Sequence, residues 1–196
     1  LRPGVVHRID KMTSGLLVFA KDDITHHNLS DQFKKRSIKR EYDLFTWNIL
    51  KKEHGIIETN IERSKQNRQK MAVAKSNSGK LAITKFRLIN SFNISEKIKI
   101  SHVKCKLYTG RTHQIRVHMS YIGNPLLGDR KYSRNNYHLQ LTDNIRFFMT
   151  ENFIKPERQA LHASKLGFYH PLKKKSLVFN SKFPEDLQKL SNYLSY

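Results

Sequence analysis

Apolar and polar residues alternate along much of this chain with the two-residue period of β-strands. Six segments show that alternation or a short apolar run, and they are residues 16–20, 38–47, 81–89, 98–108, 161–169 and 176–183. Successive side chains of a strand point to opposite faces, so the second segment should place Tyr42 and Leu44 on one face and Phe45 on the other. The short polar link 90–97 predicts a hairpin between the third and fourth segments.

Three other segments show apolar residues at the three- and four-residue spacing of a helix. The apolar positions are Ile24, Leu29 and Phe33 in the first, Ile115, Met119 and Ile122 in the second, and Leu187, Leu190 and Leu194 in the third. Asp22 and Asp23 precede the first helix and the basic residues 34–36 close it, which suits the helix dipole. Thr112 is expected to cap the second helix, and residues 124–125 are expected to end it.

The remaining chain adds little regular structure to this pattern. Segment 132–154 is polar, with a weakly helical stretch at 139–149, and we expect it to be an excursion from the core. With 196 residues, of which 38% are hydrophobic, the chain is long enough for one domain with a sizeable core. The order of elements predicts an α+β fold around a largely antiparallel mixed sheet, with residues 1–196 forming a single domain.

The charge of the chain is strongly positive. Lys and Arg number 37 against 16 Asp and Glu, which gives a net charge of +21 and predicts a polyanionic partner. The sequence has no run of 18 apolar residues and no strong basic amphipathic helix, so a nucleic acid is favoured over a membrane. Residues 51–78 are basic, and their pattern fits an RNA-contacting loop or hairpin and a solvated, mobile excursion equally well.

Cysteine and histidine usage argues against disulfide and metal chemistry. The single cysteine, Cys105, excludes an intrachain disulfide, fits a reducing cytoplasm, and lies in a strand pattern that predicts core packing. His113 and His118 are five residues apart, so they do not share a helix face that could hold one metal. The GxSxG, phosphate-loop and HExxH patterns are absent. We therefore expect no metal and no cofactor.

One carboxylate, that of Asp10, is a candidate catalytic group. Asp10 lies in the polar stretch 7–15, directly before the apolar run 16–20. A loop on a rigid strand is a common support for a catalytic group, because the loop exposes the group and the strand fixes it. Asp is also frequent in turns and caps, and these residues alone leave both readings open.

Two motifs extend the argument beyond single residues. Residues 7–17, HRIDKMTSGLL, resemble the active-site signature HRLD-x-x-TSG-L-L of the RluA family of RNA pseudouridine synthases, with Ile9 as the departure. Residues 110–118, GRTHQIRVH, and 123–129, GNPLLGD, resemble a second block of that family. The resemblance covers residues 1–169. Within the family it is closest to the RluD-like group, and the residues that carry this are 158–163 and 168–171.

The resemblance implies a catalytic set. It makes Asp10 the nucleophile or base that acts on the ribose, by adding at C1′ or by removing a sugar proton. Tyr42, in the family's K/R-x-Y motif, would stack on the flipped base, although strands are rich in aromatics for packing reasons alone. Arg116 would pair with Asp10 and favour its ionised form, where a surface helix cation is the simpler alternative.

The resemblance also implies a set of substrate contacts. Arg8 would fill the gap that the flipped base leaves. The second block supplies further candidates for RNA contact, namely Arg111, His113, Gln114 and Ile115.

The function implied is isomerisation of uridine to pseudouridine in structured RNA by a cofactor-free, cytoplasmic, monomeric enzyme. Large-subunit ribosomal RNA is favoured as the substrate. The alternatives are a transfer RNA pseudouridine synthase of the same family and a non-catalytic basic RNA-binding module. In the family several strands, and often a small RNA-binding domain, precede the signature. We therefore expect this chain to be an N-terminally truncated catalytic domain.

Overall fold

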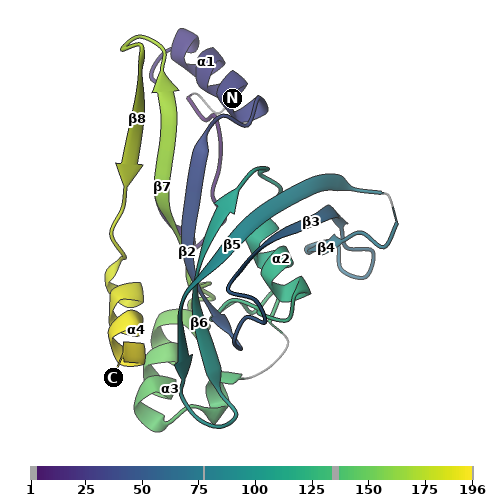
Figure 1. The fold of residues 1–196 in the computed structure, drawn as a ribbon, viewed down its shortest axis with the longest axis vertical. Coiled ribbons are helices and arrows are strands. Elements are labelled where there is room, and N and C mark those ends of the chain that lie inside the picture. The colour runs from purple at the N-terminus through teal and green to yellow at the C-terminus, as the bar shows by residue number, and fades with distance from the viewer. Residues whose placement is uncertain (1–3, 77, 134–136, 196) are drawn as a thin grey trace.

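The computed structural model describes residues 4–76, 78–133 and 137–195. Within them a single sheet runs through the molecule (Figure 1), and its strands are β1 (Ser14–Gly15), β2 (Lys39–Trp47), β3 (His54–Arg63), β4 (Met71–Val73), β5 (Lys80–Asn93), β6 (Lys99–Leu107), β7 (Leu161–His170) and β8 (Lys175–Asn180). The strand order is β1-β7-β2-β6-β5-β3-β4, and β8 also pairs with β7. The β1–β7 pair is parallel and the named pairs that follow it in this order are antiparallel. The predicted α+β class with a largely antiparallel mixed sheet is confirmed.

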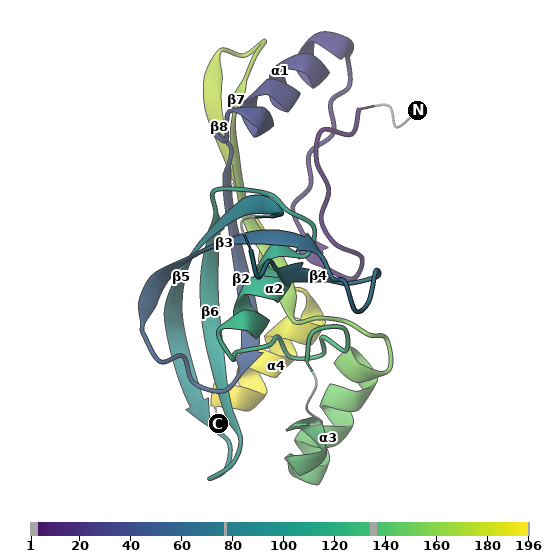
Figure 2. The same ribbon diagram turned by 90° about the vertical axis from the view of Figure 1, so that its right-hand side faces the viewer.

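Four α-helices accompany the sheet in the described part of the chain. They are α1 (Asp23–Lys34), α2 (Gln114–Tyr121), α3 (Asp143–Met149) and α4 (Glu185–Ser195), with a 3-10 turn at Tyr137–Gln140 and a π-helical continuation of α3 at Thr150–Ile154. Helix α1 lies beside the far end of β7, whereas α3 and α4 lie together at the opposite end of the molecule (Figures 1 and 2). The Gln32 side chain joins α1 to β7 through both the N–H and the carbonyl of Tyr169.

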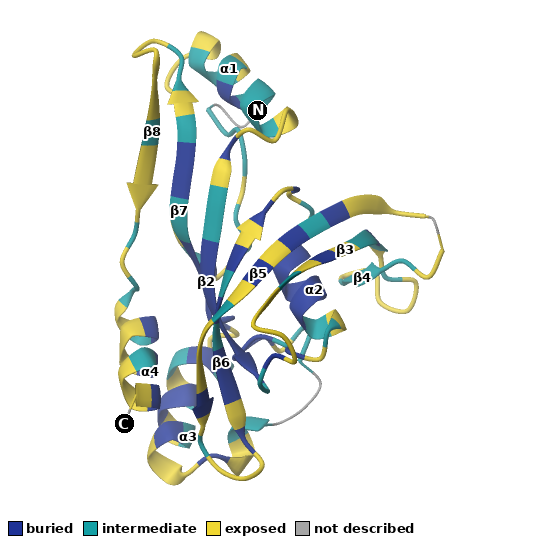
Figure 3. Ribbon diagram, in the orientation of Figure 1, coloured by how far each residue is buried: buried dark blue, intermediate teal, exposed yellow. Residues whose placement is uncertain are grey.

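Strand β2 separates two cores, as its alternation predicted. Tyr42 and Leu44 face a cluster that includes Ile115 and Met119 of α2. Phe45 faces the opposite cluster, which contains Ile145, Phe148 and Met149 of α3 and Leu187, Leu190 and Leu194 of α4. Figure 3 shows these buried positions along β2 and on the inner sides of α3 and α4. The single cysteine, Cys105, is fully buried in the α2 core, as predicted.

The apolar run 16–20 is not the strand that its composition predicted. Only Ser14 and Gly15 pair with β7, and Phe19 is 55% exposed. Gly15 has φ 106°, and a Cβ there would lie 2.2 Å from the carbonyl oxygen of Ala163. The chain therefore touches β7 closely at one point. Further along the same edge β8 takes over the pairing, so no edge is left for a longer β1.

Segment 132–154 is also different from the predicted excursion. Leu141 before α3, Phe148 and Met149 of α3, and Phe153 of the π-turn are all buried in the core that Phe45 faces. The polar residues between them occupy the solvent side, which hid the apolar face at sequence level. Within segment 51–78, β3, a turn and β4 form a hairpin, and contact of this hairpin with RNA stays a prediction. In α1, Leu29 is buried as expected, but Ile24 is 71% exposed.

Candidate active site

A cleft of about 450 Å³ opens between the 6–13 loop, the end of α1 and the start of α2. Its wall contains seven of the eight residues singled out from the sequence, namely Arg8, Asp10, Tyr42, Arg111, His113, Gln114 and Ile115. The eighth, Arg116, lies behind Asp10 and contacts it. Two motifs that are a hundred residues apart in sequence therefore meet at one site.

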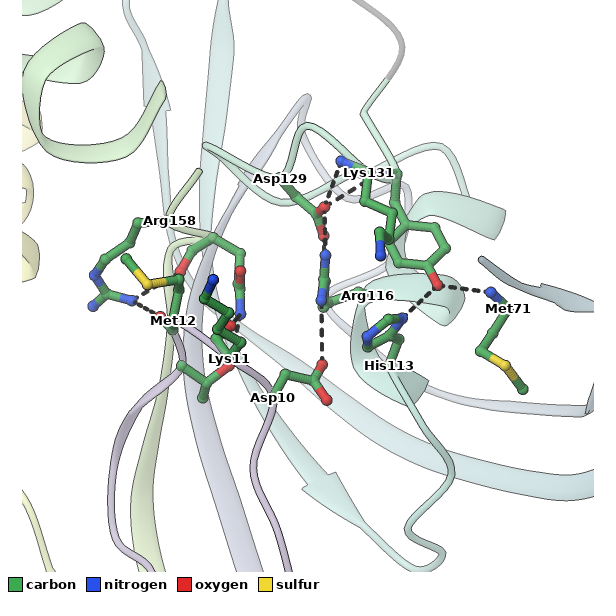
Figure 4. Close-up of polar contacts among 12 residues, drawn as sticks. Asp10, Lys11, Met12, Met71, His113, Arg116, Asp129, Lys131 and Arg158 are labelled. Atoms are coloured by element: carbon green, nitrogen blue, oxygen red, sulfur yellow. Dashed lines mark hydrogen bonds and ion pairs between the residues drawn. The ribbon is translucent and has the colours of Figure 1, made fainter. Parts of the chain in front are cut away.

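Asp10 and Arg116 form the centre of this site (Figure 4). The Nη1 atom of Arg116 lies 3.4 Å from Oδ2 of Asp10, whose side chain is 18% exposed. The same guanidinium donates through Nε to Oδ2 of Asp129 at 2.7 Å and through Nη2 to Oδ1 at 2.9 Å. Burial alone would lower the pKa of Arg116, but the hydrogen bonds and charge of Asp129 outweigh it and raise that pKa. Arg116 is therefore a fixed cation beside Asp10.

Asp129 is held from several sides. Its side chain has no exposed surface. Besides Arg116, its Oδ1 atom accepts hydrogen bonds from the backbone N–H groups of Lys131 and Tyr132 at 3.1 and 3.2 Å. A buried carboxylate with this many donors is a rigid anchor, and it fixes the plane of the Arg116 guanidinium.

The loop that carries Asp10 is held by Arg158 and Gln159, just before β7. Arg158 donates from Nη1 to the carbonyl of Met12 at 2.6 Å and from Nη2 to Oγ of Ser14 at 3.0 Å. Its Nε atom donates to Asp186 of α4. Gln159 donates from Nε2 to the carbonyl of Lys11 at 2.7 Å and to Oγ1 of Thr13 at 2.9 Å.

The backbone of this loop needs such support. Met12 has φ 66°, a left-handed conformation that is uncommon for a residue other than glycine. Such conformations persist only where surrounding contacts determine them, and they cluster at functional sites. The carbonyl of Met12 is the group that Arg158 holds. Together, Arg158 and Gln159 fix the course of the chain directly after Asp10.

Tyr132 links the site to the β3–β4 hairpin. Its hydroxyl accepts a hydrogen bond from the backbone N–H of Met71 at 2.9 Å and shares another with Nδ1 of His113 at 2.7 Å. The Arg116 guanidinium lies over its ring, 5.1 Å from the centroid. Burial raises the pKa of Tyr132 to about 12 and lowers the pKa of His113. Both rings are therefore neutral near pH 7.

Tyr42 presents its ring to the cleft from β2. Its side chain is almost fully buried, and a register shift between Glu41 and Tyr42 accompanies its position. Burial raises the pKa of the Tyr42 hydroxyl, so the ring is uncharged. A neutral aromatic face next to a carboxylate suits the stacking of a nucleobase.

Comparison with known proteins is decisive at this point. The RNA pseudouridylate synthase family matches residues 1–121. This chain belongs to that family. The resemblance of its two motifs to the RluA-type synthases is thereby confirmed, and so is the predicted fold of the family.

Several relatives are similar over nearly all of this chain. Ribosomal large subunit pseudouridine synthase D of Zymomonas mobilis is 43% identical over 194 residues, which cover 98% of this chain and 56% of that protein. The uncharacterized RNA pseudouridine synthase YlyB of Bacillus subtilis is 40% identical over 190 residues, which cover 97% of this chain and 55% of that protein. The chain thus spans about half the length of the curated relatives it matches.

A solved structure supports the same fold. Human RNA Pseudouridylate Synthase Domain Containing 1 superposes with a TM-score of 0.73 at 22% identity, over 97% of this chain and 79% of that one.

The start of helix α2, within the second motif, differs from the prediction that Thr112 caps it. The N-cap of α2 is His113, with φ 55° and no side-chain cap bond. Gln114 does the bonding instead, because its Oε1 atom accepts from the Thr109 hydroxyl at 2.7 Å and from the Arg111 N–H at 2.9 Å. Its Nε2 atom donates to the Ile83 carbonyl at 3.1 Å. Gln114 therefore ties α2 to β5, with its amide engaged by protein groups.

Four important residues of this site were given no role from the sequence: Asp129, Tyr132, Arg158 and Gln159. Asp129 ends the quoted block 123–129, and Arg158 and Gln159 begin the run 158–163, so both motif stretches contained the signal. Tyr132 gave no signal of its own. Its role depends on the hairpin that approaches it in three dimensions.

Two further observations concern the described residues as a set. They contain no group of three or more His, Cys, Asp or Glu side chains placed to hold a metal ion. Within the same residues, every helix is too short or too polar to cross a membrane.

Proposed function

We propose that this chain converts uridine to pseudouridine in structured RNA, and that large-subunit ribosomal RNA is its substrate. The observation that carries the proposal is the Asp10 carboxylate in the cleft, with the Arg116 guanidinium 3.4 Å away. A carboxylate beside a fixed cation in a partly enclosed pocket can act on a sugar carbon or take a sugar proton. A pure RNA-binding module needs positive charge but not this pair.

The reaction is an isomerisation in which the atoms balance without a second substrate. The bond between uracil N1 and ribose C1′ breaks, the base turns, and a bond forms between C5 and C1′. The proton on C5 is released, and N1 gains a proton. The uridine first leaves its stack, because its sugar carbon is inaccessible within a helix.

Each residue of the site has a task in this proposal. Asp10 acts on the ribose, by addition at C1′ or by proton removal. Tyr42 offers its ring to the extruded base, which compensates for lost stacking. Arg116 places a positive charge beside Asp10, and Asp129 keeps Arg116 in place. Arg158 fixes the backbone after Asp10, so the carboxylate meets the sugar at a defined distance.

The choice of ribosomal RNA rests on the relatives. Several of them carry the name ribosomal large subunit pseudouridine synthase D, at identities between 34% and 43%. The net charge of +21 suits a large folded RNA. Transfer RNA is the competing substrate that a direct test must include.

Tritium release gives that test. Large-subunit ribosomal RNA and transfer RNA transcripts carrying uridine tritiated at C5 are incubated with the protein, because each conversion frees the C5 label into water. We expect release from the ribosomal transcript only, at one or a few uridines found by chemical mapping. Release from neither RNA, with a folded protein, contradicts the proposed activity, and release from transfer RNA alone contradicts the substrate.

A further inference from the structure

Arg40 is a guanidinium in the cleft wall whose role the site described so far leaves open. It lies on β2, two residues before Tyr42. Its guanidinium packs over the ring of Phe33 from α1, 5.5 Å from the centroid. It also meets Gly110, where a Cβ would come within 2.7 Å of Nη1. The group is therefore confined by an aromatic ring and by a bare stretch of backbone.

The guanidinium of Arg40 has no acidic partner. Its Nε atom is buried and makes no hydrogen bond. None of the ion pairs within residues 4–76, 78–133 and 137–195 includes it. Burial accordingly lowers the pKa of Arg40. Arg116 and Arg158, the two buried arginines among the described residues, each have a carboxylate partner.

An unpaired, desolvated cation is costly for a folded protein, so its retention at a cleft needs a reason. The surroundings suggest one. Lys34 and Arg36 at the end of α1 and Arg111 before α2 line the same cleft. Asp10 is the only carboxylate among the described residues that line it, and Arg116 already faces Asp10. The wall around Arg40 is thus prepared for an anion that comes from outside.

We propose that Arg40 binds a backbone phosphate adjacent to the uridine that enters the cleft. This inference rests on the proposed function, since RNA supplies the anion. A planar guanidinium matches two oxygens of a phosphodiester, and its fixed position would set how far the nucleotide backbone enters. Arg40 and Tyr42 project from neighbouring positions of one strand face, so one would hold the phosphate while the other faces the base. Lys34 and Arg36 add charge at the rim.

The test measures whether the Arg40 side chain and one backbone phosphate contribute to RNA binding through the same contact. Short target RNAs are made with a single neutral methylphosphonate on the 5′ or the 3′ side of the target uridine, with a 2′-deoxy sugar before that linkage in modified and unmodified RNAs alike. Binding is measured with Asp10→Asn protein, which does not turn the RNA over. At one of the two linkages we expect the neutral group to weaken binding about tenfold, as for a lost hydrogen bond to a charged group.

The Arg40→Gln change in the same background should weaken binding of the unmodified RNA about tenfold. The methylphosphonate should then add less than about twofold, because the contact is already gone. Arg40→Lys keeps the charge without the fork, so a reduced but measurable phosphonate effect is expected. Arg87→Gln on the exposed side of β5 is the matched control, and it should keep the full phosphonate effect.

Equal phosphonate effects in the presence and absence of the Arg40 guanidinium would overturn the inference. If Arg40→Gln does not fold, judged by its thermal melt, Arg40→Lys decides by the same comparison. Tritium release by the unaltered protein separates the two proposals. If the protein turns RNA over but the phosphonate effect does not depend on Arg40, only this inference is removed. If the phosphonate effect depends on Arg40 but no turnover occurs, the phosphate contact remains and the proposed activity is removed.

Discussion

Arg116 is bound to Asp129 more tightly than to Asp10. Its Nε and Nη2 atoms lie 2.7 and 2.9 Å from the two oxygens of Asp129, whereas Nη1 lies 3.4 Å from Asp10. The first two distances are those of strong charge-assisted hydrogen bonds, and the third is longer. Asp10 therefore has a compensating charge beside it but is not locked by it. The proposed action of Asp10 on a ribose needs that freedom.

The first prediction concerns Asp129→Asn. The amide keeps the size of the side chain but removes the charge opposite the buried Arg116 guanidinium, and one amide atom becomes a donor. We expect the free energy of unfolding in urea to fall by about 1.5–3 kcal/mol, the range for hydrogen bonds to charged groups. Turnover should fall as well, because Arg116 loses its orientation.

Asp143→Asn is the control for this change. Asp143 pairs with Arg146 on the exposed side of α3. Its loss should cost less than about 1 kcal/mol and leave turnover unchanged. Equal unfolding energies for Asp129→Asn and the unaltered protein would show that Asp129 does not anchor Arg116.

The second prediction separates chemistry from binding. Asp10→Asn should reduce tritium release at least ~10⁴-fold, the scale of covalent and acid–base contributions. RNA binding should change less than about tenfold, because lysine and arginine side chains carry most of the affinity. Asp23→Asn in the first turn of α1 is the control and should leave both quantities unchanged. Pseudouridine formation by Asp10→Asn, in a preparation free of host enzyme, would remove Asp10 from the mechanism.

The third prediction concerns the support of the Asp10 loop. Lysine at position 158 cannot contact the Met12 carbonyl, Ser14 and Asp186 together. Arg158→Lys should therefore lower the single-turnover rate, by up to about 100-fold for a displacement near 1 Å. RNA affinity should stay within about threefold, because the loop still reaches the cleft. Asp186→Asn should reproduce part of the rate effect through Arg158.

The exposed pair of Arg130 and Glu157 provides the control for this series. Arg130→Lys should leave rate and affinity unchanged. A parallel loss of RNA affinity and rate in Arg158→Lys would indicate general unfolding of the site, which the melting temperature would also reveal.

The sequence predicted the elements whose burial is decided locally. Strand β2 has two buried faces, and its alternation alone placed Tyr42 opposite Phe45 correctly. Helix α4 buries Leu187 and Leu190 as its spacing required. The motif residues Asp10 and Arg116 meet, as the resemblance of both stretches to one family site predicted.

Elements decided by distant partners were not predictable in this way. Residues 16–20 are apolar enough for a strand, but the edge of β7 that they would need belongs to β8. Segment 132–154 is polar as a whole, and the apolar side of α3 within it becomes part of a core only because β2 and α4 pack against it. Thr112 is a good capping residue, yet Gln114 reaches back across the turn and bonds Thr109 instead.

The support of the Asp10 loop was hidden for a related reason. Arg158 and Gln159 recognise backbone carbonyls of Lys11 and Met12, and a carbonyl leaves no trace in the sequence. Only the partner side chains are visible there, and an Arg–Gln pair before a strand has many possible uses. Its function follows from the meeting of β1 and β7, which the pattern of either strand alone does not reveal.

The last prediction concerns stability at low pH and rests on His118. This histidine lies in α2 with no exposed surface. Its Nδ1 atom lies 2.9 Å from the hydroxyl oxygen of Thr84, and its Nε2 atom lies 3.1 Å from that of Thr59. Burial lowers its pKa to about 4. An unfolded chain presents the same group with a pKa near ~6.5.

The direction of the effect follows from these two pKa values. Below about pH 6.5 the unfolded chain binds a proton at His118, while the folded protein does not until about pH 4. The free energy of unfolding should therefore fall as pH drops through this window, by on the order of 3 kcal/mol from this group. Urea titrations at pH 6.5, 5.5 and 4.5 measure the slope. His118→Gln keeps a polar side chain between the two threonines and removes the titration of His118. Between pH 6.5 and 4.5 the free energy of unfolding of this variant should therefore fall about 2 kcal/mol less than that of the unaltered protein.

The exposed His54→Gln is the control and should follow the unaltered protein. Parallel curves for His118→Gln and the unaltered protein would mean that the buried imidazole is protonated in the folded state as easily as in the unfolded one.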